Sequence, residues 1–169
     1  MRKIPLTRGK FALVDDADYE WLSQWKWHAL KSVRKGETKF YACRHGGYGR
    51  NSGVYIYMHR LIMDAPPERS IDHADTDTLN NQRENLRFAT HFENMANKKK
   101  QTVKNGLPVT SRYKGVNLDK RRGRWNAEIR KGNKKTWLGS FLSEVDAAKA
   151  YDAAAVRLHG EFCSINFKD

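Results

Sequence analysis

The stretch that decides the fold runs from residue 124 to residue 141 and reads RWNAEIRKGNKKTWLGSF. Its first half alternates Trp125, Ala127 and Ile129 with polar residues, which is the period of a strand with one apolar face. Gly132 and Asn133 then mark a turn before a second strand over residues 135–141. The pattern predicts two antiparallel strands with one face on a core and the other in solvent.

The flanking segments complete a small domain. A further strand is predicted over residues 112–118, and residues 119–123 form the turn that follows it. A helix is predicted from Ser143, a natural N-cap, to about His159, with Gly160 suited to the C-cap. Small and aromatic side chains form its inner stripe: Ala147, Ala148, Tyr151, Ala155 and Leu158. We therefore expect a three-stranded antiparallel sheet packed on one helix.

The charge of the chain is strongly positive and unevenly distributed. The 169 residues contain 32 Lys and Arg against 19 Asp and Glu, a formal net charge of +13. Residues 98–169 hold 17 of these basic residues against seven acidic ones, whereas residues 1–97 hold 15 against 12. Such an excess attracts polyanions, and nucleic acid is the first candidate, with anionic lipid as the weaker one.

Several classes of protein are disfavoured by the composition. The longest aliphatic or aromatic run, Val54 to Met58, is far too short to cross a membrane. The basic start of the chain lacks the apolar stretch of a secretory signal, so we expect an intracellular protein with no membrane partner. Cys43 and Cys163 lie far apart, which disfavours a disulfide framework or a zinc site and suggests reduced core residues.

A second informative stretch runs from residue 70 to residue 94 and reads SIDHADTDTLNNQRENLRFATHFEN. It starts as a short strand, passes through a loop rich in Asp, Thr and Asn, and returns as a strand over residues 86–89. Thr90 and Glu93 form a capping box, which predicts that a helix starts there. The predicted local order is strand, loop, strand and helix.

The residues of this stretch that can carry chemistry are Asp72, His73, Asn85 and Asn94. If the helix packs back on the hairpin, Asp72 and Asn94 converge and offer oxygen atoms to a hard divalent cation. His73 points to the other side of the strand and suits a general base near neutral pH. Asn85 is the candidate for pinning both the loop and the imidazole ring.

The same stretch resembles the HNH endonucleases of the ββα-metal (His-Me) fold, and within them the phage and intron-encoded homing enzymes. The resemblance covers about residues 4–97. It implies that Asp72 and Asn94 bind Mg²⁺, with Mn²⁺ as the second choice and no zinc, that His73 activates water and that Asn85 supports the loop. The role of Arg60 is open between structural support and a DNA phosphate contact. The motifs are Asp72-His73, Asn80-Asn81, Asn85-Leu86-Arg87, Asn94 and the upstream His59-Arg60-Leu61-Ile62.

Residues 111–167 are similar to the Apetala-two or ethylene-response-factor (AP2/ERF) DNA-binding domain. The similarity rests on the segments YKGV from residue 113, WNAEIR from residue 125, WLGSF from residue 137 and AAKAYD from residue 147. The loop around Asp119 and Arg121-Arg122 departs from the plant pattern, so the target sequence does not transfer. By the resemblance, six residues lie on the DNA-facing surface of the sheet: Lys114, Asn117, Glu128, Arg130, Lys135 and Trp137.

The sequence thus predicts an α+β protein: a nuclease domain with a strand-rich N-terminal extension over residues 1–97, a basic linker over 98–110 and an AP2-like domain over 111–169. The linker is either solvated or follows a phosphate backbone. The predicted function is a site-specific, metal-dependent DNA endonuclease of the homing type that nicks or cuts double-stranded DNA of a bacterial or phage-infected host, in its cytoplasm and nucleoid. No obligatory protein partner is expected. A catalytically inactive, sequence-specific DNA-binding regulator is the alternative, and an RNA-binding module is weaker because no RNA motif is evident.

Overall fold

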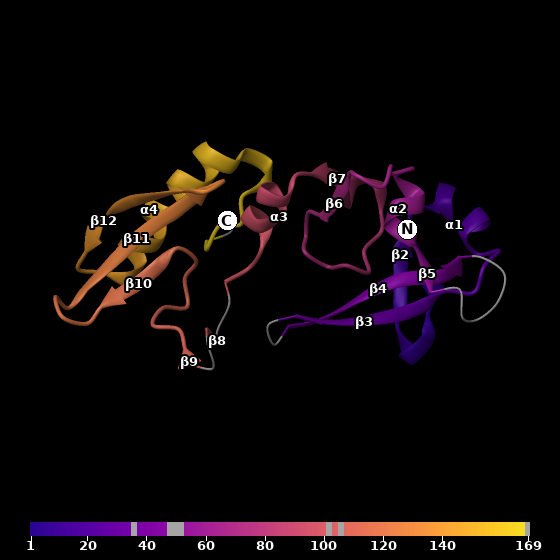
Figure 1. The fold of residues 1–169 in the computed structure, drawn as a ribbon, viewed down its shortest axis with the longest axis horizontal. Coiled ribbons are helices and arrows are strands. Elements are labelled where there is room, and N and C mark those ends of the chain that lie inside the picture. Colours follow the sequence, from indigo (N-terminus) through magenta and orange to yellow (C-terminus); the bar gives the residue numbers. More distant parts are fainter. Residues whose placement is uncertain (35–36, 47–52, 101–102, 105–106, 168–169) are drawn as a thin grey trace. The chain divides into compact units, whose positions relative to one another are not determined.

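The computed structural model describes residues 1–34, 37–46, 53–100, 103–104 and 107–167 (Figure 1). The chain divides into two compact units, Met1–Thr90 and His91–Asp169, and each is described by itself. The division follows Thr90, whereas the sequence predicted a first domain that ends at residue 97. The predicted helix of the hairpin region therefore belongs to the second unit.

The first unit opens with a small hairpin and a three-stranded sheet. Strand β1 (Arg2–Pro5) pairs antiparallel with β2 (Phe11–Val14), and helix α1 (Asp16–Leu22) follows. The sheet has the antiparallel order β3 (His28–Arg34), β4 (Glu37–Gly46) and β5 (Val54–Tyr57), and leads into helix α2 (Met58–Ile62). Apolar side chains from the hairpin, the two helices and the sheet form one core, which includes Ala12, Val14, Leu22, Trp27 and Met58.

Two element boundaries in this unit differ from the sequence prediction. In the sequence, Trp21, Leu22 and Trp25 recur at helical spacing, which predicts one helix, but α1 ends at Leu22, where Ser23 donates through Oγ to the carbonyl of Tyr19 at 2.7 Å. The apolar run over residues 54–58 also predicts a strand, but the strand ends at Tyr57, because Met58 is the first residue of α2 and packs into the core. Periodicity alone did not indicate so short a helix.

A hairpin closes the first unit. Strand β6 (Ser70–His73) pairs antiparallel with β7 (Leu86–Ala89), and a short 3-10 helix over Arg83–Asn85 precedes β7. Arg83 anchors the loop, because its guanidinium binds the buried carboxylate of Asp18 on α1 at 2.7 Å. Hydrogen bonds from Arg83 lower the pKa of Asp18, so the pair stays ionised at neutral pH. The predicted strand, loop and strand are confirmed.

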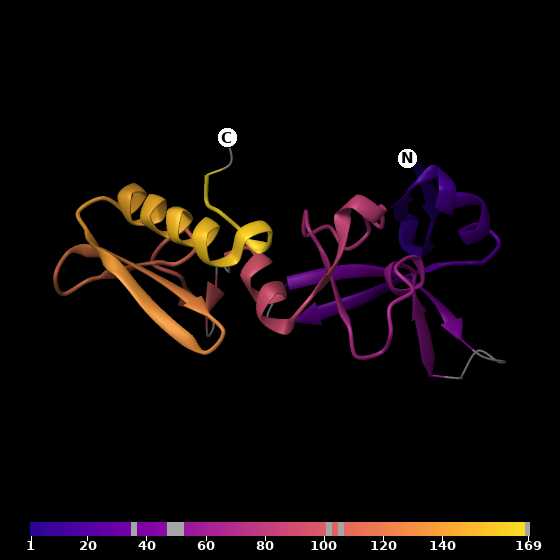
Figure 2. The same ribbon diagram turned by 90° about the horizontal axis from the view of Figure 1, so that it is seen from above.

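The second unit begins with helix α3 (His91–Asn97) and a two-stranded ribbon of β8 (Val103–Lys104) and β9 (Leu107–Pro108). The ribbon lies within the predicted linker, of which residues 101–102 and 105–106 are outside the described residues. The main sheet has the antiparallel order β10 (Val116–Asp119), β11 (Arg124–Lys131) and β12 (Lys134–Phe141). Helix α4 (Glu144–His159) covers one face of this sheet (Figure 2), and a 3-10 turn over Gly160–Phe162 follows.

The caps of α4 confirm the sequence prediction. The Ser143 side chain accepts hydrogen bonds from the amides of Val145 and Asp146, and Gly160 ends the helix with a φ of 53°. The buried stripe is made of Ala147, Ala148, Tyr151, Ala154 and Ala155. These small side chains let the helix lie close to one face of the sheet. The opposite face of the sheet is not covered by α4.

The first strand of this sheet is shorter than predicted. Residues 112–115 form a turn, in which Gly115 has a φ of 76°, so the strand starts at Val116 and not at residue 112. A Cβ atom on Gly115 would lie 1.9 Å from the ring of Tyr151 on α4, so the close approach of turn and helix requires glycine here. Within the described part of the chain, no helix has the length and apolar character to span a membrane.

Candidate nucleic-acid interface and hairpin site

One face of the β10–β12 sheet points away from α4 and carries polar and charged side chains. The antiparallel register pairs Glu128 with Trp137 and Arg130 with Lys135, and it pairs Asn117 with Asn126. Ala127 and Ile129 alternate with these residues and are buried under α4. We call this surface the open face; it consists of Asn117, Asn126, Glu128, Arg130, Lys135 and Trp137.

A β-bulge decides which side chain of β12 reaches the open face. The register shifts between Ala127, which pairs with Gly139, and Glu128, which pairs with Trp137. The extra residue, Leu138, packs into the core, while the Trp137 side chain is 65% exposed. Regular pairing beyond Gly139 would instead place Trp137 opposite Ile129 on the core side. The bulge therefore puts a large aromatic ring on the open face.

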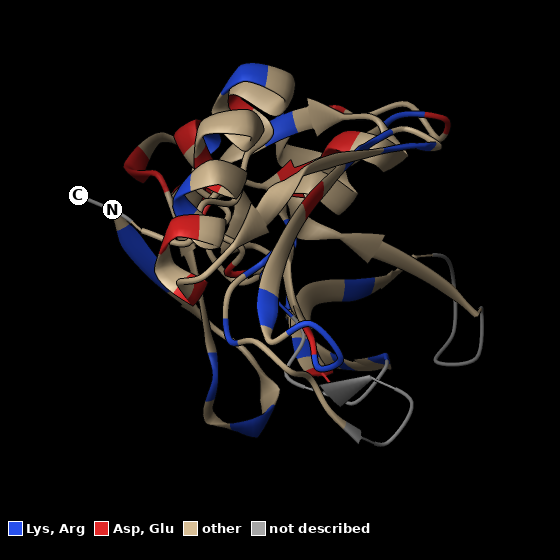
Figure 3. Cartoon of the chain, turned by 90° about the vertical axis from the view of Figure 1, so that its left-hand side faces the viewer, with Lys and Arg blue, Asp and Glu red and all other residues tan. Residues whose placement is uncertain are grey.

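Basic residues are frequent on the strands that form this face. Lys and Arg outnumber Asp and Glu along the strands and the turns between them, where Asp119 and Glu128 are the acidic residues, whereas α4 carries both signs of charge in similar number (Figure 3). Lys135 forms an ion pair with Glu128 at 2.5 Å, and Arg124 donates to the carbonyl of Ser140 at 3.1 Å. The Arg130 side chain is exposed. Five of the six predicted DNA-facing residues thus share one face of the sheet.

The sixth predicted residue, Lys114, lies elsewhere and requires a correction. It precedes β10, and its ammonium group donates to the carbonyl of Ala96 and, at 2.6 Å, to that of Lys98. Burial lowers the pKa of Lys114 to about 8. Because main-chain carbonyls hold the ammonium group, Lys114 acts within the fold and not as a member of the open face.

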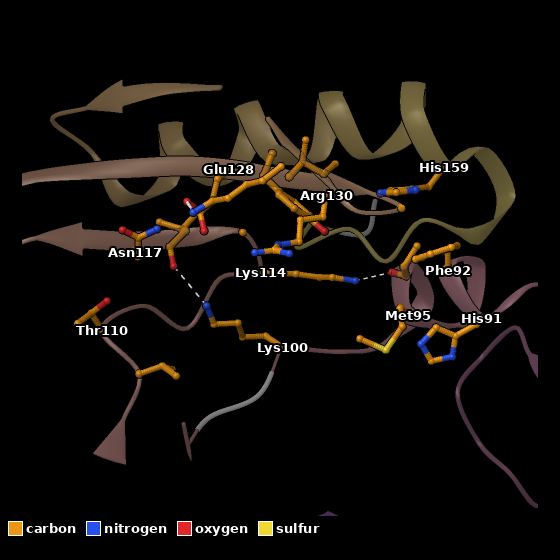
Figure 4. A pocket seen from close by; sticks show the side chains of 18 of the residues that line it. His91, Phe92, Met95, Lys100, Thr110, Lys114, Asn117, Glu128, Arg130 and His159 are labelled. Carbon is orange, nitrogen blue, oxygen red and sulfur yellow. Dashed lines mark hydrogen bonds and ion pairs between the residues drawn. The ribbon is translucent and has the colours of Figure 1, made fainter. Parts of the chain in front are cut away.

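A groove runs beside the open face within the second unit. It has a volume of about 830 Å³ and lies between the sheet, α3 and the segment that follows α3 (Figure 4). Phe92 and Met95 line it from α3, and Arg130 and Lys135 line it from the sheet. Lys100 donates to the carbonyl of Val116 at 3.2 Å along its margin.

In the first unit, His73 lies buried at the end of β6. Its Nε2 atom is 3.4 Å from Oδ1 of Asn81, whose Nδ2 donates to the carbonyl of Leu79 at 3.1 Å. Since Oδ1 only accepts, the fitting neutral tautomer carries its proton on Nε2, which leaves Nδ1 as the basic nitrogen. Burial lowers the pKa of His73, so the imidazole is neutral near pH 7.

Asn85, predicted to pin both the loop and the imidazole ring, contacts the loop of the hairpin. Its Oδ1 accepts from the amide of Asp75 at 2.9 Å, and its Nδ2 donates to the carbonyl of Asn80 at 2.8 Å. The amide that faces the imidazole ring is that of Asn81, a fully buried residue to which the sequence analysis assigned no role of its own. Its only signal in the sequence was its place in the Asn80-Asn81 motif.

The two predicted metal ligands lie in different units. Asp72 is buried on β6 in the first unit, whereas Asn94 lies on α3 in the second. Arg87, the register partner of Asp72 on β7, donates to Asp72 Oδ2 from Nε at 3.1 Å and from its terminal nitrogen at 2.8 Å. In the described ranges, no three His, Cys, Asp or Glu side chains are grouped to hold a metal ion.

Arg60, for which the sequence left a DNA phosphate contact open, has a structural role. Its guanidinium donates to the carbonyl groups of Ala65 at 3.2 Å, Pro66 at 2.6 Å and Arg69 at 2.9 Å. These three bonds tie α2 to the segment that leads into β6. Of the two roles that the sequence left open, the structure supports the structural one.

His59 on α2 packs against the hairpin, a contact that the sequence did not indicate. Its ring centroid lies 5.2 Å from that of His73 and 5.6 Å from that of Tyr57. Burial, His73 and Arg60 together lower the pKa of His59 to about 3. Two neutral imidazoles therefore pack against each other beside β6.

The stability of the first unit is expected to fall with acid because of His59. Its folded-state pKa of about 3 lies below the ordinary value of 6.5, so between these pH values the unfolded chain binds a proton that the folded chain does not. His59 alone should lower the free energy of unfolding by up to about 1.4 kcal/mol per pH unit below pH 6.5, and the buried His73, whose pKa is also lowered, adds to the slope. Urea unfolding of the full chain at several pH values measures this slope.

A pair of variants isolates this histidine from the carboxylates that also titrate in acid. The variant His59→Gln should show a shallower pH dependence, and the matched exchange of the exposed His91, His91→Gln, should keep the slope of the parent protein. Equal slopes for all three proteins would contradict the assignment to His59.

Comparison with known proteins relates the second unit to one family of domains. The family model of the AP2 domain matches residues 111–161. An AP2/ERF and B3 domain-containing protein of Oryza sativa subsp. japonica is 47% identical over 58 residues, which cover 34% of this chain and 16% of that protein. The AP2/ERF and B3 domain-containing transcription factor RAV1 of Arabidopsis thaliana is 43% identical over 60 residues, 36% of this chain and 17% of the relative.

The chain thus spans about a sixth of the length of these curated relatives, and the similarity concerns their AP2 domains. No HNH motif is identified, so the nuclease assignment of the first unit stays a prediction. The three-stranded sheet packed on α4 agrees with the matched model in position and architecture. Residues 111–161 are an AP2/ERF DNA-binding domain.

Proposed function

We propose that this protein binds double-stranded DNA in a sequence-selective way through the open face of its AP2 domain. The observation that carries the proposal is the exposed Trp137 next to the basic side chains of Arg130 and Lys135. A two- or three-stranded sheet face fits the major groove, where Arg donors meet guanine edges and phosphates. The charge excess of residues 98–169 supplies the attraction to DNA.

The test of this proposal is a selection of duplexes from a random pool with the full chain. Sequence-selective binding predicts that one short motif is enriched over successive rounds. The affinity for that motif should exceed the affinity for scrambled duplexes by about 10³-fold or more at physiological salt. Equal affinity for selected and scrambled duplexes would contradict sequence selectivity.

A second candidate function is hydrolysis of DNA phosphodiesters by the first unit, with His73 as general base. It is supported by a neutral imidazole oriented by Asn81, in a loop that Asn85 holds. In this proposal Nδ1 of His73 takes the proton of the attacking water, and Asn81 keeps the other ring nitrogen protonated.

The nuclease proposal also needs a divalent cation, for which Mg²⁺ is the first choice. Asp72 carries oxygen donors of the kind that Mg²⁺ prefers and would hold it while sharing its carboxylate with Arg87. Asn94, the other ligand that the sequence predicts, belongs to the second unit. A bound cation would stabilise charge on the phosphate and on the leaving oxygen.

Incubation with total DNA of a bacterial or phage-infected host distinguishes the nuclease from a DNA-binding regulator without activity. With Mg²⁺ present, a nuclease produces ends that sequencing locates at recurrent sites. A protein that retards its selected duplex but leaves it intact supports the regulator. The outcome for binding is independent of the outcome for cleavage, so each proposal can fail alone.

A further inference from the structure

The ammonium group of Lys114 joins two segments of the second unit. It donates to the carbonyls of Ala96 and Lys98, which lie at and just after the C-terminal end of α3 (Figure 4). Positive charge is favourable at this end of a helix, where carbonyls lack partners within the helix. Lys114 thereby fixes the end of α3 to the start of the AP2 domain.

Further contacts hold the segment after α3 against the AP2 domain. Lys100 Nζ donates to the carbonyl of Val116 at 3.2 Å, and the amide of Leu118 donates to Thr110 Oγ1 at 3.1 Å. Ala96 and Asn97 are buried at the end of α3. The beginning and the end of the predicted linker are therefore docked on β10.

The docked segment brings positive charge next to the open face. The groove between α3 and the sheet is lined by Lys100, Lys114, Arg130 and Lys135. Among its described lining residues the one carboxylate is Glu128, which is paired with Lys135 at 2.5 Å. Lys98 and Lys99 are exposed at the end of α3. A surface of this charge fits a phosphate backbone.

We propose that α3 and the triplet Lys98–Lys100 extend the DNA-binding surface of the AP2 domain and that Lys114 positions them. The partner is the sugar-phosphate backbone of duplex DNA next to the bases that the open face contacts. This inference rests on the proposed DNA binding by the AP2 domain. It assigns the phosphate contacts to Lys98 and Lys99, and it makes Lys114 a positioning residue that DNA does not touch.

The test measures the salt dependence of binding to a short mixed-sequence duplex by the full chain. The double variant Lys98→Ala/Lys99→Ala should reduce the slope of log K against log salt by about 1 to 2, because each lost phosphate contact accounts for about 0.9. Lys149→Ala is the control, because it removes an exposed cation from α4 and should leave the slope unchanged.

Lys114 is tested by a cycle of variants. Lys114→Met should reduce the slope as much as the double variant does, and the triple variant should be no weaker than the double one. Lys114→Arg keeps a cationic donor at this position, so its slope of log K against log salt should equal that of the unmodified protein. If Lys114→Met fails to fold, the double variant and Lys114→Arg still decide.

Two results would overturn the inference: an unchanged slope in Lys98→Ala/Lys99→Ala, or additive losses in the triple variant, which would indicate a direct contact of Lys114 with phosphate. Failure of the unmodified protein to bind any duplex would instead contradict the proposed function.

Discussion

Replacing His73 with alanine is expected to lower Mg²⁺-dependent cleavage of duplex DNA by about 10²–10⁴-fold, the usual contribution of a positioned general base. The imidazole is buried and neutral, and Asn81 holds Nε2 at 3.4 Å, so the variant loses the group that would accept the proton of water. Affinity for the duplex should change little, because the open face lies in the second unit. Single-turnover cleavage and duplex retardation measure the two quantities.

The control for this variant is His28→Ala, which removes an imidazole from β3 in the first unit. It should cleave at the rate of the parent protein. Because His73 is buried, the circular dichroism spectrum of His73→Ala must match that of the parent before its rate is interpreted. A folded His73→Ala variant that cuts at the full rate would exclude this residue as the base.

A further prediction concerns the products of plasmid cleavage by the parent protein. One His73 per chain can activate water against one strand at a time, so a monomer should relax supercoiled plasmid without linearising it. Immediate linear product at low protein concentration would contradict single-strand cutting by one chain.

The architecture of the second unit was predictable because its signals are local. Alternation in β11 and the caps of α4 at Ser143 and Gly160 depend on residues next to each other in sequence. The bulge at Leu138 is not local, since it arises from the pairing of two strands and from packing under α4. The family resemblance predicted that Trp137 lies on the open face. Regular pairing of β11 with β12, without the bulge, would have predicted the core side instead.

The polar residues were harder to assign because side-chain type does not reveal a main-chain partner. The family resemblance placed Lys114 on DNA, and the sequence left a phosphate contact open for Arg60, yet both cations donate to carbonyl groups of the fold. Asn81 reaches His73 only through the path of a long loop, which β2 holds through the amide and carbonyl of Leu13. Such contacts depend on tertiary structure and leave no periodic pattern.

Removal of both Arg130 and Trp137 is expected to lower affinity for the selected DNA motif by about 10²–10³-fold. A bidentate Arg contact with a base is worth about 1–3 kcal/mol, and about 1.4 kcal/mol corresponds to a tenfold change in affinity. The exposed Trp137 adds a large apolar contact surface, since its ring already stands clear of the core. The measurement is a titration of the selected duplex with Arg130→Ala/Trp137→Ala at fixed salt.

The single variant Arg130→Ala separates selectivity from general attraction to DNA. A base contact predicts a loss of about 10–100-fold on the selected motif and a relaxed preference at one position, with nearly unchanged binding to scrambled duplex. A phosphate contact predicts equal losses on both duplexes and a lower salt slope. Arg157→Ala is the matched control, since Arg157 lies exposed on α4 on the other side of the sheet. If Arg157→Ala lost as much affinity for the selected motif as Arg130→Ala, net charge alone would drive binding. That result would contradict sequence recognition by the open face.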